Sequence, residues 1–129
     1  MELKEYQKKA MTTCMESSHN FTYMFDNLVS EVGEFASKVA KMKRKGEAKI
    51  IDDQLAIKGN VMAARVNELE KEAGDILWQT AGLCDVMGWN LENVARMNLD
   101  KLQQRKKNGT IDGSGDGVTK DERMVEERK

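Results

Sequence analysis

Two short segments of this chain carry acidic pairs in the same pattern. Residues 28–35 and 69–76 both read L-x-x-E-x-G-(acid)-(apolar), 41 residues apart. The four acids are Glu31 and Glu34 in the first copy and Glu72 and Asp75 in the second. Acids three residues apart lie on neighbouring turns of one helix face, and both pairs fall beside the apolar stripe of their own segment. Two such helices packed side by side would bring four carboxylates together at the edge of a shared core.

Clustered carboxylates predict a bound cation. Four neighbouring negative charges raise one another's pKa values unless a positive charge neutralises them, and oxygen-only ligands suit Mg²⁺ or Mn²⁺. Zinc prefers cysteine and histidine, and His19 is the only histidine of the sequence. The alternative is that both acidic pairs belong to solvated helix faces, where Lys38 and Lys71 would form surface ion pairs of little energetic value.

A glycine lies inside each acidic pair. Gly33 and Gly74 occupy equivalent positions of the two copies. Glycine in a helix costs about 1 kcal/mol relative to alanine. Two glycines at equivalent positions therefore predict close backbone packing beside the acids.

A second set of polar side chains lies in the last helical segment. Asn98, Lys101 and Arg105 are spaced i, i+3, i+7 and share one helix face. Arginine makes forked hydrogen bonds to phosphate oxygens and lysine acts as a point charge, so the three are candidate phosphate ligands. The alternative is a basic helix end that complements the helix dipole. An earlier group of cations allows the same two interpretations, with solvation of a helix end favoured: Lys41, Lys43, Arg44 and Lys45.

Helices must position all of these residues. Helical periodicity covers residues 3–15, 20–44, part of 57–87, and 91–108. Gly88 can close the third helix, Asn90 can cap the fourth, and Gly109 can take the left-handed position after it.

The segments outside the helices are expected to be irregular. No stretch shows sustained two-residue alternation, so no sheet is predicted. Residues 43–60 contain two glycines and mixed charges, which indicates a loop with a short helical turn.

Length and composition limit the class of protein. The 129 residues and 14.6 kDa predict one domain over residues 1–116, followed by a charged tail over 117–129. Zero prolines and 5% aromatic residues favour an all-α fold, a four-helix-type bundle with a short N-terminal helix. The limited burial available to so few helices predicts that oligomerisation completes or extends this bundle.

Charge and hydropathy indicate where the protein works. A net charge of −1 argues against binding a nucleic-acid polymer. No apolar run approaches the roughly 20 residues of a membrane-spanning helix, so no membrane association is expected. Two cysteines are too few for a disulfide scaffold and suit a reducing cytoplasm.

The motifs together resemble the MazG-like nucleoside triphosphate pyrophosphohydrolases of the all-α pyrophosphatase superfamily. The likeness covers residues 4–116 and rests on EYQKKAMTT, LVSEVGEFASKVAK, EAGDILWQTAGL and NLDKLQQRKKNGTIDGSGD, in that order. The chain between Glu34 and Glu72 is longer than in compact members of that family. The excess lies in residues 46–60, where it could form or cover the base pocket.

The resemblance implies a function and a site. The activity would be Mg²⁺-dependent cleavage of a (deoxy)nucleoside triphosphate between the α and β phosphates, giving a monophosphate and pyrophosphate, in a homodimer or homotetramer. The implied metal ligands are Glu31, Glu34, Glu72 and Asp75, and the implied phosphate-binding residues are Asn98, Lys101 and Arg105. A non-catalytic helical interaction module is the competing hypothesis.

Overall fold

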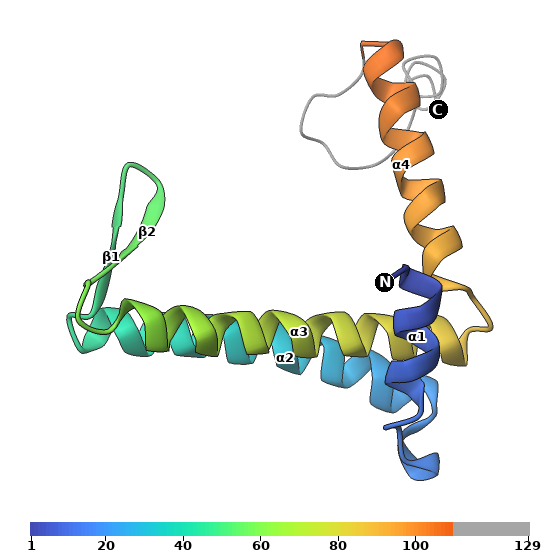
Figure 1. Ribbon diagram of the computed structural model, residues 1–129, viewed down its shortest axis with the longest axis horizontal. Coiled ribbons are helices and arrows are strands. Elements are labelled where there is room, and N and C mark those ends of the chain that lie inside the picture. Colours follow the sequence, from blue (N-terminus) through green and yellow to red (C-terminus); the bar gives the residue numbers. More distant parts are fainter. Residues whose placement is uncertain (110–129) are drawn as a thin grey trace, which may run out of the picture.

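The computed structural model describes residues 1–109, and in this part of the chain the fold is almost entirely helical (Figure 1). The elements are, in order, α1 (Leu3–Met11), the 3₁₀ turn η1 (Glu16–Ser18), α2 (Phe21–Arg44), β1 (Ala48–Ile51), β2 (Gln54–Ile57), α3 (Met62–Val86) and α4 (Leu91–Lys107). The predicted helical fold class is confirmed. The Gly113–Asp116 loop and the predicted tail over 117–129 lie outside the described residues.

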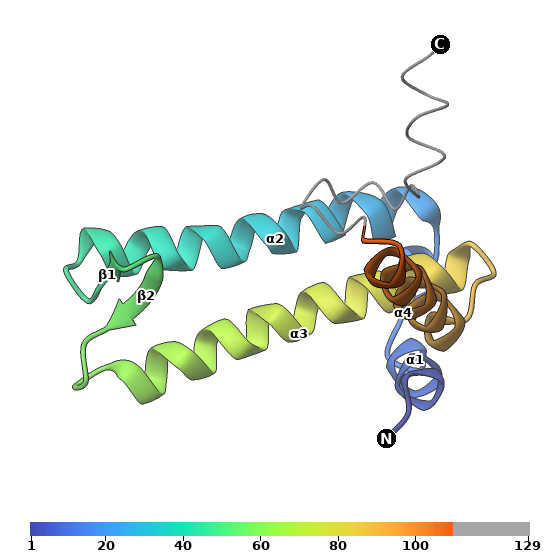
Figure 2. The ribbon, with the colours of Figure 1, turned by 90° about the horizontal axis from the view of Figure 1, so that it is seen from above.

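A long antiparallel pair of helices, α2 and α3, forms the main body of the fold (Figures 1 and 2). They have 24 and 25 residues, and most of the stability of helices in proteins comes from packing of an amphipathic face, here of one helix on the other. Near one end of the pair, Met24 of α2 is fully buried. A side chain at Gly82 of α3 would clash with Sδ and Cε of Met24. Glycine at this position therefore leaves room for the Met24 side chain between the two helices.

The close packing predicted at the two glycines of the acidic pairs is wrong within one chain. A Cβ atom added at Gly33 or at Gly74 would have no neighbour within 4 Å among the described residues. Both positions are exposed on the outside of the helix pair. The close contact is made instead at Gly82, which lies outside the repeated motif.

A β-hairpin joins α2 to α3, so the prediction of a loop without a sheet over residues 43–60 is also wrong. The strands β1 and β2 pair antiparallel, with Ala48 opposite Ile57. Asp52 and Asp53 form the two-residue turn and both have positive φ, 50° and 61°, as a type I′ hairpin turn requires. Each strand has only four residues, too few for two-residue alternation to stand out in the sequence.

Packing against the helices holds the hairpin at the end of the α2/α3 pair. Leu55 and Ile57 of β2 contact a buried cluster formed by Met42, Ala48 and Leu69. The strands therefore gain their stability from the helices, since an isolated two-stranded hairpin is marginally stable in water.

The helices α1 and α4 gather at the opposite end of the pair. Leu91 is buried there with Ala81 and Cys84. The buried Gln7 of α1 joins the elements: its amide nitrogen donates to the carbonyl of Trp89 over 2.9 Å, and its carbonyl oxygen accepts from the Leu91 backbone N–H over 2.9 Å.

The helix-end signals of the sequence are confirmed. Gly88 and Gly109 both take positive φ values, 74° and 67°. The Asn90 side chain accepts the backbone N–H of Glu92 over 2.9 Å at the start of α4. Beyond this capped start, α4 projects out of the plane of the α2/α3 pair (Figures 1 and 2). None of the described helices is both long and apolar enough to cross a membrane.

Candidate metal centre

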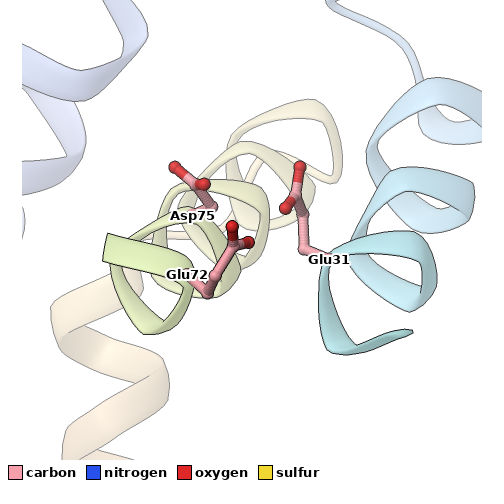
Figure 3. A group of neighbouring side chains, drawn as sticks. All are labelled: Glu31, Glu72 and Asp75. Atoms are coloured by element: carbon pink, nitrogen blue, oxygen red, sulfur yellow. The ribbon is translucent and has the colours of Figure 1, made fainter. Parts of the chain in front are cut away.

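Three of the four predicted carboxylates converge between α2 and α3. Glu31 comes from α2, and Glu72 and Asp75 come from successive turns of α3 (Figure 3). One oxygen from each residue lies within 4.8 Å of the others. The repeated spacing explains the arrangement, because each helix presents its acids beside the apolar stripe that packs against the other helix.

The fourth carboxylate, Glu34, lies outside this group of three. It is exposed one turn beyond Glu31 and lines a neighbouring cavity. Its charge nevertheless reaches the group, because it contributes to the raised pKa of Glu31. The structure thus brings three of the acids to one point and sets the fourth at its edge.

Electrostatic repulsion makes this centre unfavourable when all the carboxylates are ionised. Burial raises the pKa of Glu31 above its ordinary value of 4.5, and the charges of Asp75, Glu72 and Glu34 raise it further. The predicted ion pair of Lys38 with an acid is present: its Nζ lies 3.6 Å from Oε1 of Glu72. One ammonium group does not balance four carboxylates.

The donor set fits a hard divalent cation. All three converging donors are carboxylate oxygens, which Mg²⁺ and Mn²⁺ prefer. Opposite ligands of Mg²⁺ lie about 4.2 Å apart, since each bond is about 2.1 Å long, and the 4.8 Å limit of the cluster brackets this separation. His19 is engaged elsewhere, with Nε2 2.6 Å from Oδ2 of Asp85.

The predicted phosphate-binding residues of α4 do not lie beside the carboxylates of the same chain. Asn98 and Lys101 are exposed, and Arg105 is buried. These residues run from the middle of α4 to its last turn, and α4 extends away from the α2/α3 pair (Figures 1 and 2). In Figure 3 the carboxyl groups point to one side of that pair, and the faint orange ribbon of α4 runs on the other. Helical spacing could place the three residues on one face but could not set the direction of α4.

A polar cavity beside the carboxylates was not anticipated from the sequence. It measures about 290 Å³ and is lined by Glu34 and by side chains from the second half of α2, the base of the hairpin and the first half of α3. Lys38, Lys41 and Lys45 all border it. Their spacing of three and four residues is a helical signal that they share a face with the acids.

The fold and the centre define a class of protein: a helical protein in which two antiparallel helices present a cluster of carboxylates suited to a divalent cation. Residues 19–110 match the MazG nucleotide pyrophosphohydrolase domain. The Gene 37 protein of Mycobacterium phage L5 is 35% identical over 101 residues, which cover 78% of this chain and 79% of the phage protein. No solved structure gives a significant match.

The chain therefore belongs to the MazG nucleotide pyrophosphohydrolase family. The resemblance drawn from the two acidic motifs is confirmed. Membership indicates nucleotide pyrophosphohydrolase activity in general, and the carboxylate cluster agrees with the divalent-metal dependence of such enzymes.

Proposed function

We propose that this protein is a Mg²⁺-dependent nucleoside triphosphate pyrophosphohydrolase that cleaves (deoxy)nucleoside triphosphates between the α and β phosphates. The observation that carries the proposal is the convergence of Glu31, Glu72 and Asp75 within 4.8 Å in a chain of the MazG family. The products are a nucleoside monophosphate and pyrophosphate.

The carboxylates have two roles in this reaction. Glu31, Glu34, Glu72 and Asp75 hold the cation, and one of them accepts a proton from the attacking water. A bound Mg²⁺ would lower the pKa of a coordinated water and neutralise charge on the phosphates. The water oxygen bonds to the α-phosphorus while the bond from that phosphorus to the bridging oxygen breaks, and pyrophosphate leaves in line. This reaction needs no covalent intermediate with the protein.

The direction of α4 supports an active site shared between copies of the chain. We assign Asn98, Lys101 and Arg105 to the phosphate chain of a nucleotide bound to the carboxylates of a neighbouring copy, because α4 leads away from the carboxylates of its own chain. Apolar side chains exposed along α4 agree with an interface there. Met97 is 70% exposed and Leu99 is 58% exposed.

An apolar stripe on α2 supports a homodimer or homotetramer. Phe21, Phe25, Val29 and Val32 are all about half exposed, and their spacing of four, four and three residues puts them on one side of α2. At 100° per residue the centre of this side lies nearly opposite Glu34 and about 115° around the helix from Glu31. A second copy can therefore cover the stripe and leave the carboxylates accessible. Residence in the cytoplasm is part of the proposal, in accord with the free thiols of Cys14 and Cys84.

Pyrophosphate release tests the reaction directly. A panel of canonical and modified NTPs and dNTPs is incubated with Mg²⁺, with Mn²⁺ and with EDTA, and pyrophosphate and monophosphate are quantified. We expect equal amounts of the two products, only with metal, and the panel ranks the bases and sugars. Release of orthophosphate instead would show that the enzyme cleaves a different bond of the phosphate chain.

A thermal shift with Mg²⁺ and a non-hydrolysable nucleotide tests the competing hypothesis. The proposed enzyme gains thermal stability from these ligands, because they bind the folded state alone. Absence of both turnover and stabilisation would favour a non-catalytic helical interaction module.

A further inference from the structure

The polar cavity next to the carboxylates has features of an anion site. It lies between the two helices at the hairpin end, and Glu34 lines the side nearest the metal centre. Four cationic side chains border it: Lys38, Lys41, Lys45 and Arg65. Its volume of about 290 Å³ is ample for a small polar group.

The cations of this cavity differ in what already neutralises them. Arg65 donates to Glu47 over 2.9 Å and to Glu68 over 3.0 Å, so its charge is balanced by the protein. By contrast, Lys41 and Lys45 form no ion pair with any residue of the described range 1–109, and both are exposed. Two ammonium groups therefore remain available to an anionic ligand.

Helix geometry places these lysines in line with Glu34, along the cavity that all three border. Side chains of an α-helix lean toward its N-terminus, and Lys41 and Lys45 lie C-terminal to Glu34 on the same face of α2. The Cα atom of Lys41 is about 10 Å farther along the helix axis than that of Glu34, at 1.5 Å per residue. Glu34 leans in the same direction, so Lys41 and Lys45 stay beyond it along the axis and border the part of the cavity on the hairpin side. Lys38 lies between the cavity and the metal centre, where it contacts Glu72.

We propose that this cavity receives the β and γ phosphates of the substrate, with Lys41 and Lys45 binding the leaving pyrophosphate. The proposal rests on the proposed function and adds the orientation of the nucleotide: pyrophosphate toward the β-hairpin, nucleoside toward α1. Lysine is suited to this role as a compact point charge. Negative charge that develops on the leaving pyrophosphate in the transition state is stabilised by cations placed there in advance.

The test compares two double variants with the same change in charge. Lys41→Ala/Lys45→Ala removes the proposed ligands, and Lys43→Ala/Lys49→Ala removes two lysines that line a separate cavity beside the hairpin. The measurements are KM for the best nucleotide and the inhibition constants of pyrophosphate and of the monophosphate product. We expect the first variant to raise KM and the pyrophosphate inhibition constant about tenfold, with monophosphate inhibition unchanged. Lys41→Arg should restore part of the loss.

Two results would overturn the orientation. Weaker inhibition by the monophosphate, with pyrophosphate inhibition intact, would place the nucleoside end in the cavity. Equal KM values and equal inhibition constants in the two double variants would show that Lys41 and Lys45 are ordinary surface lysines. Circular dichroism checks that both variants keep the wild-type helix content.

Calorimetry separates failure of this proposal from failure of the proposed function. If the wild-type protein has no turnover, titration with pyrophosphate and Mg²⁺ still tests the cavity. Binding that is lost in Lys41→Ala/Lys45→Ala supports the anion site on its own. No binding of pyrophosphate to the wild-type protein overturns it.

Discussion

At the scale of the residue, the repulsion among the clustered carboxylates lowers the folding stability of the metal-free protein, and the same cluster of oxygen atoms suits a cation. Burial and three neighbouring charges raise the pKa of Glu31, so its ionised form is less favourable in the folded protein than in the unfolded chain. Below the ordinary pKa of 4.5, where Glu31 is protonated in both states, the free energy of unfolding of the metal-free protein has its full contribution from this group. It loses that contribution as the pH rises through the higher folded-state pKa.

Neutralising the Glu31 carboxylate is expected to raise the stability of the metal-free protein and to abolish its activity. Glu31→Gln removes a repelled charge, so at neutral pH in EDTA its melting temperature should exceed that of the wild type by a few degrees. Both Glu31→Gln and Asp75→Asn should abolish turnover and the thermal stabilisation by Mg²⁺ or Mn²⁺, with the helical circular dichroism retained. Asp26→Asn, an exposed acid on the same helix, is the matched control. Full activity in either site variant would contradict the assignment.

The raised pKa of Glu31 also predicts the pH dependence of metal binding. A cation binds the deprotonated carboxylates and releases protons, so affinity falls as the pH drops through the folded-state pKa of Glu31. At a fixed Mn²⁺ concentration, we expect the Mn²⁺-induced rise in melting temperature to shrink as the pH falls toward and below the raised pKa of Glu31. Glu31→Gln should show no such transition. The same pH dependence in Glu31→Gln as in the wild type would mean that Glu31 is not a ligand.

At the scale of the element, the approach of α2 to α3 decides which acids meet. The two helices touch closely where Met24 packs over Gly82, and this contact helps to fix their relative position along the pair. Glu31 then faces the two acids of α3, while Glu34 falls beside the cavity. At the other end of the α2/α3 pair, Leu55 and Ile57 of the β-hairpin pack against both helices and help to hold them together.

A pair of glycine substitutions tests this account of the helix packing. Gly82→Ala introduces a Cβ that meets the Met24 side chain, and we expect it to lower the free energy of unfolding by about 1–3 kcal/mol. Gly74→Ala meets nothing within 4 Å and should raise that free energy by up to about 1 kcal/mol, the helix-propensity difference. Urea denaturation followed by circular dichroism measures both. Destabilisation by Gly74→Ala would show that a neighbouring copy packs closely at this position.

At the scale of the whole molecule, one chain leaves much apolar surface uncovered. The long α2/α3 pair is a single layer of two helices, and α4 contacts it only near one end and then projects from it (Figure 2). Exposed apolar side chains on both α2 and α4 are what we expect if a second copy of the chain packs against them.

A single charge on the apolar stripe should disrupt this assembly. Val29 is 59% exposed, so Val29→Glu costs the isolated chain little but would bury a charge in the proposed interface. We expect light scattering after size-exclusion chromatography to give the monomer mass for Val29→Glu. Asn67→Glu, at an exposed polar position of α3, should keep the wild-type mass. A monomeric wild type, or an unchanged mass for Val29→Glu, would contradict the interface.

The sequence by itself determined the features that depend on neighbours along the chain. Helix ends follow from local hydrogen bonds: Asn20 accepts the N–H of Tyr23 over 2.8 Å, and Asn90 caps α4. The sharing of one helix face by the acids of each motif follows from the helical repeat. These local rules, with the repeated motif, were sufficient to identify the helical fold and the family.

Only the tertiary structure decided how the elements meet. The axial offset of α2 against α3 selects Glu31 from its pair, and the Gln7 bridge at the start of α4 helps to hold the helix in a direction away from the carboxylates. The hairpin escaped prediction because its four-residue strands are stabilised by contacts with helices distant in the sequence. The physical reason is common to all three cases: helical periodicity gives the face on which a side chain lies, whereas packing between distant segments determines what that face meets.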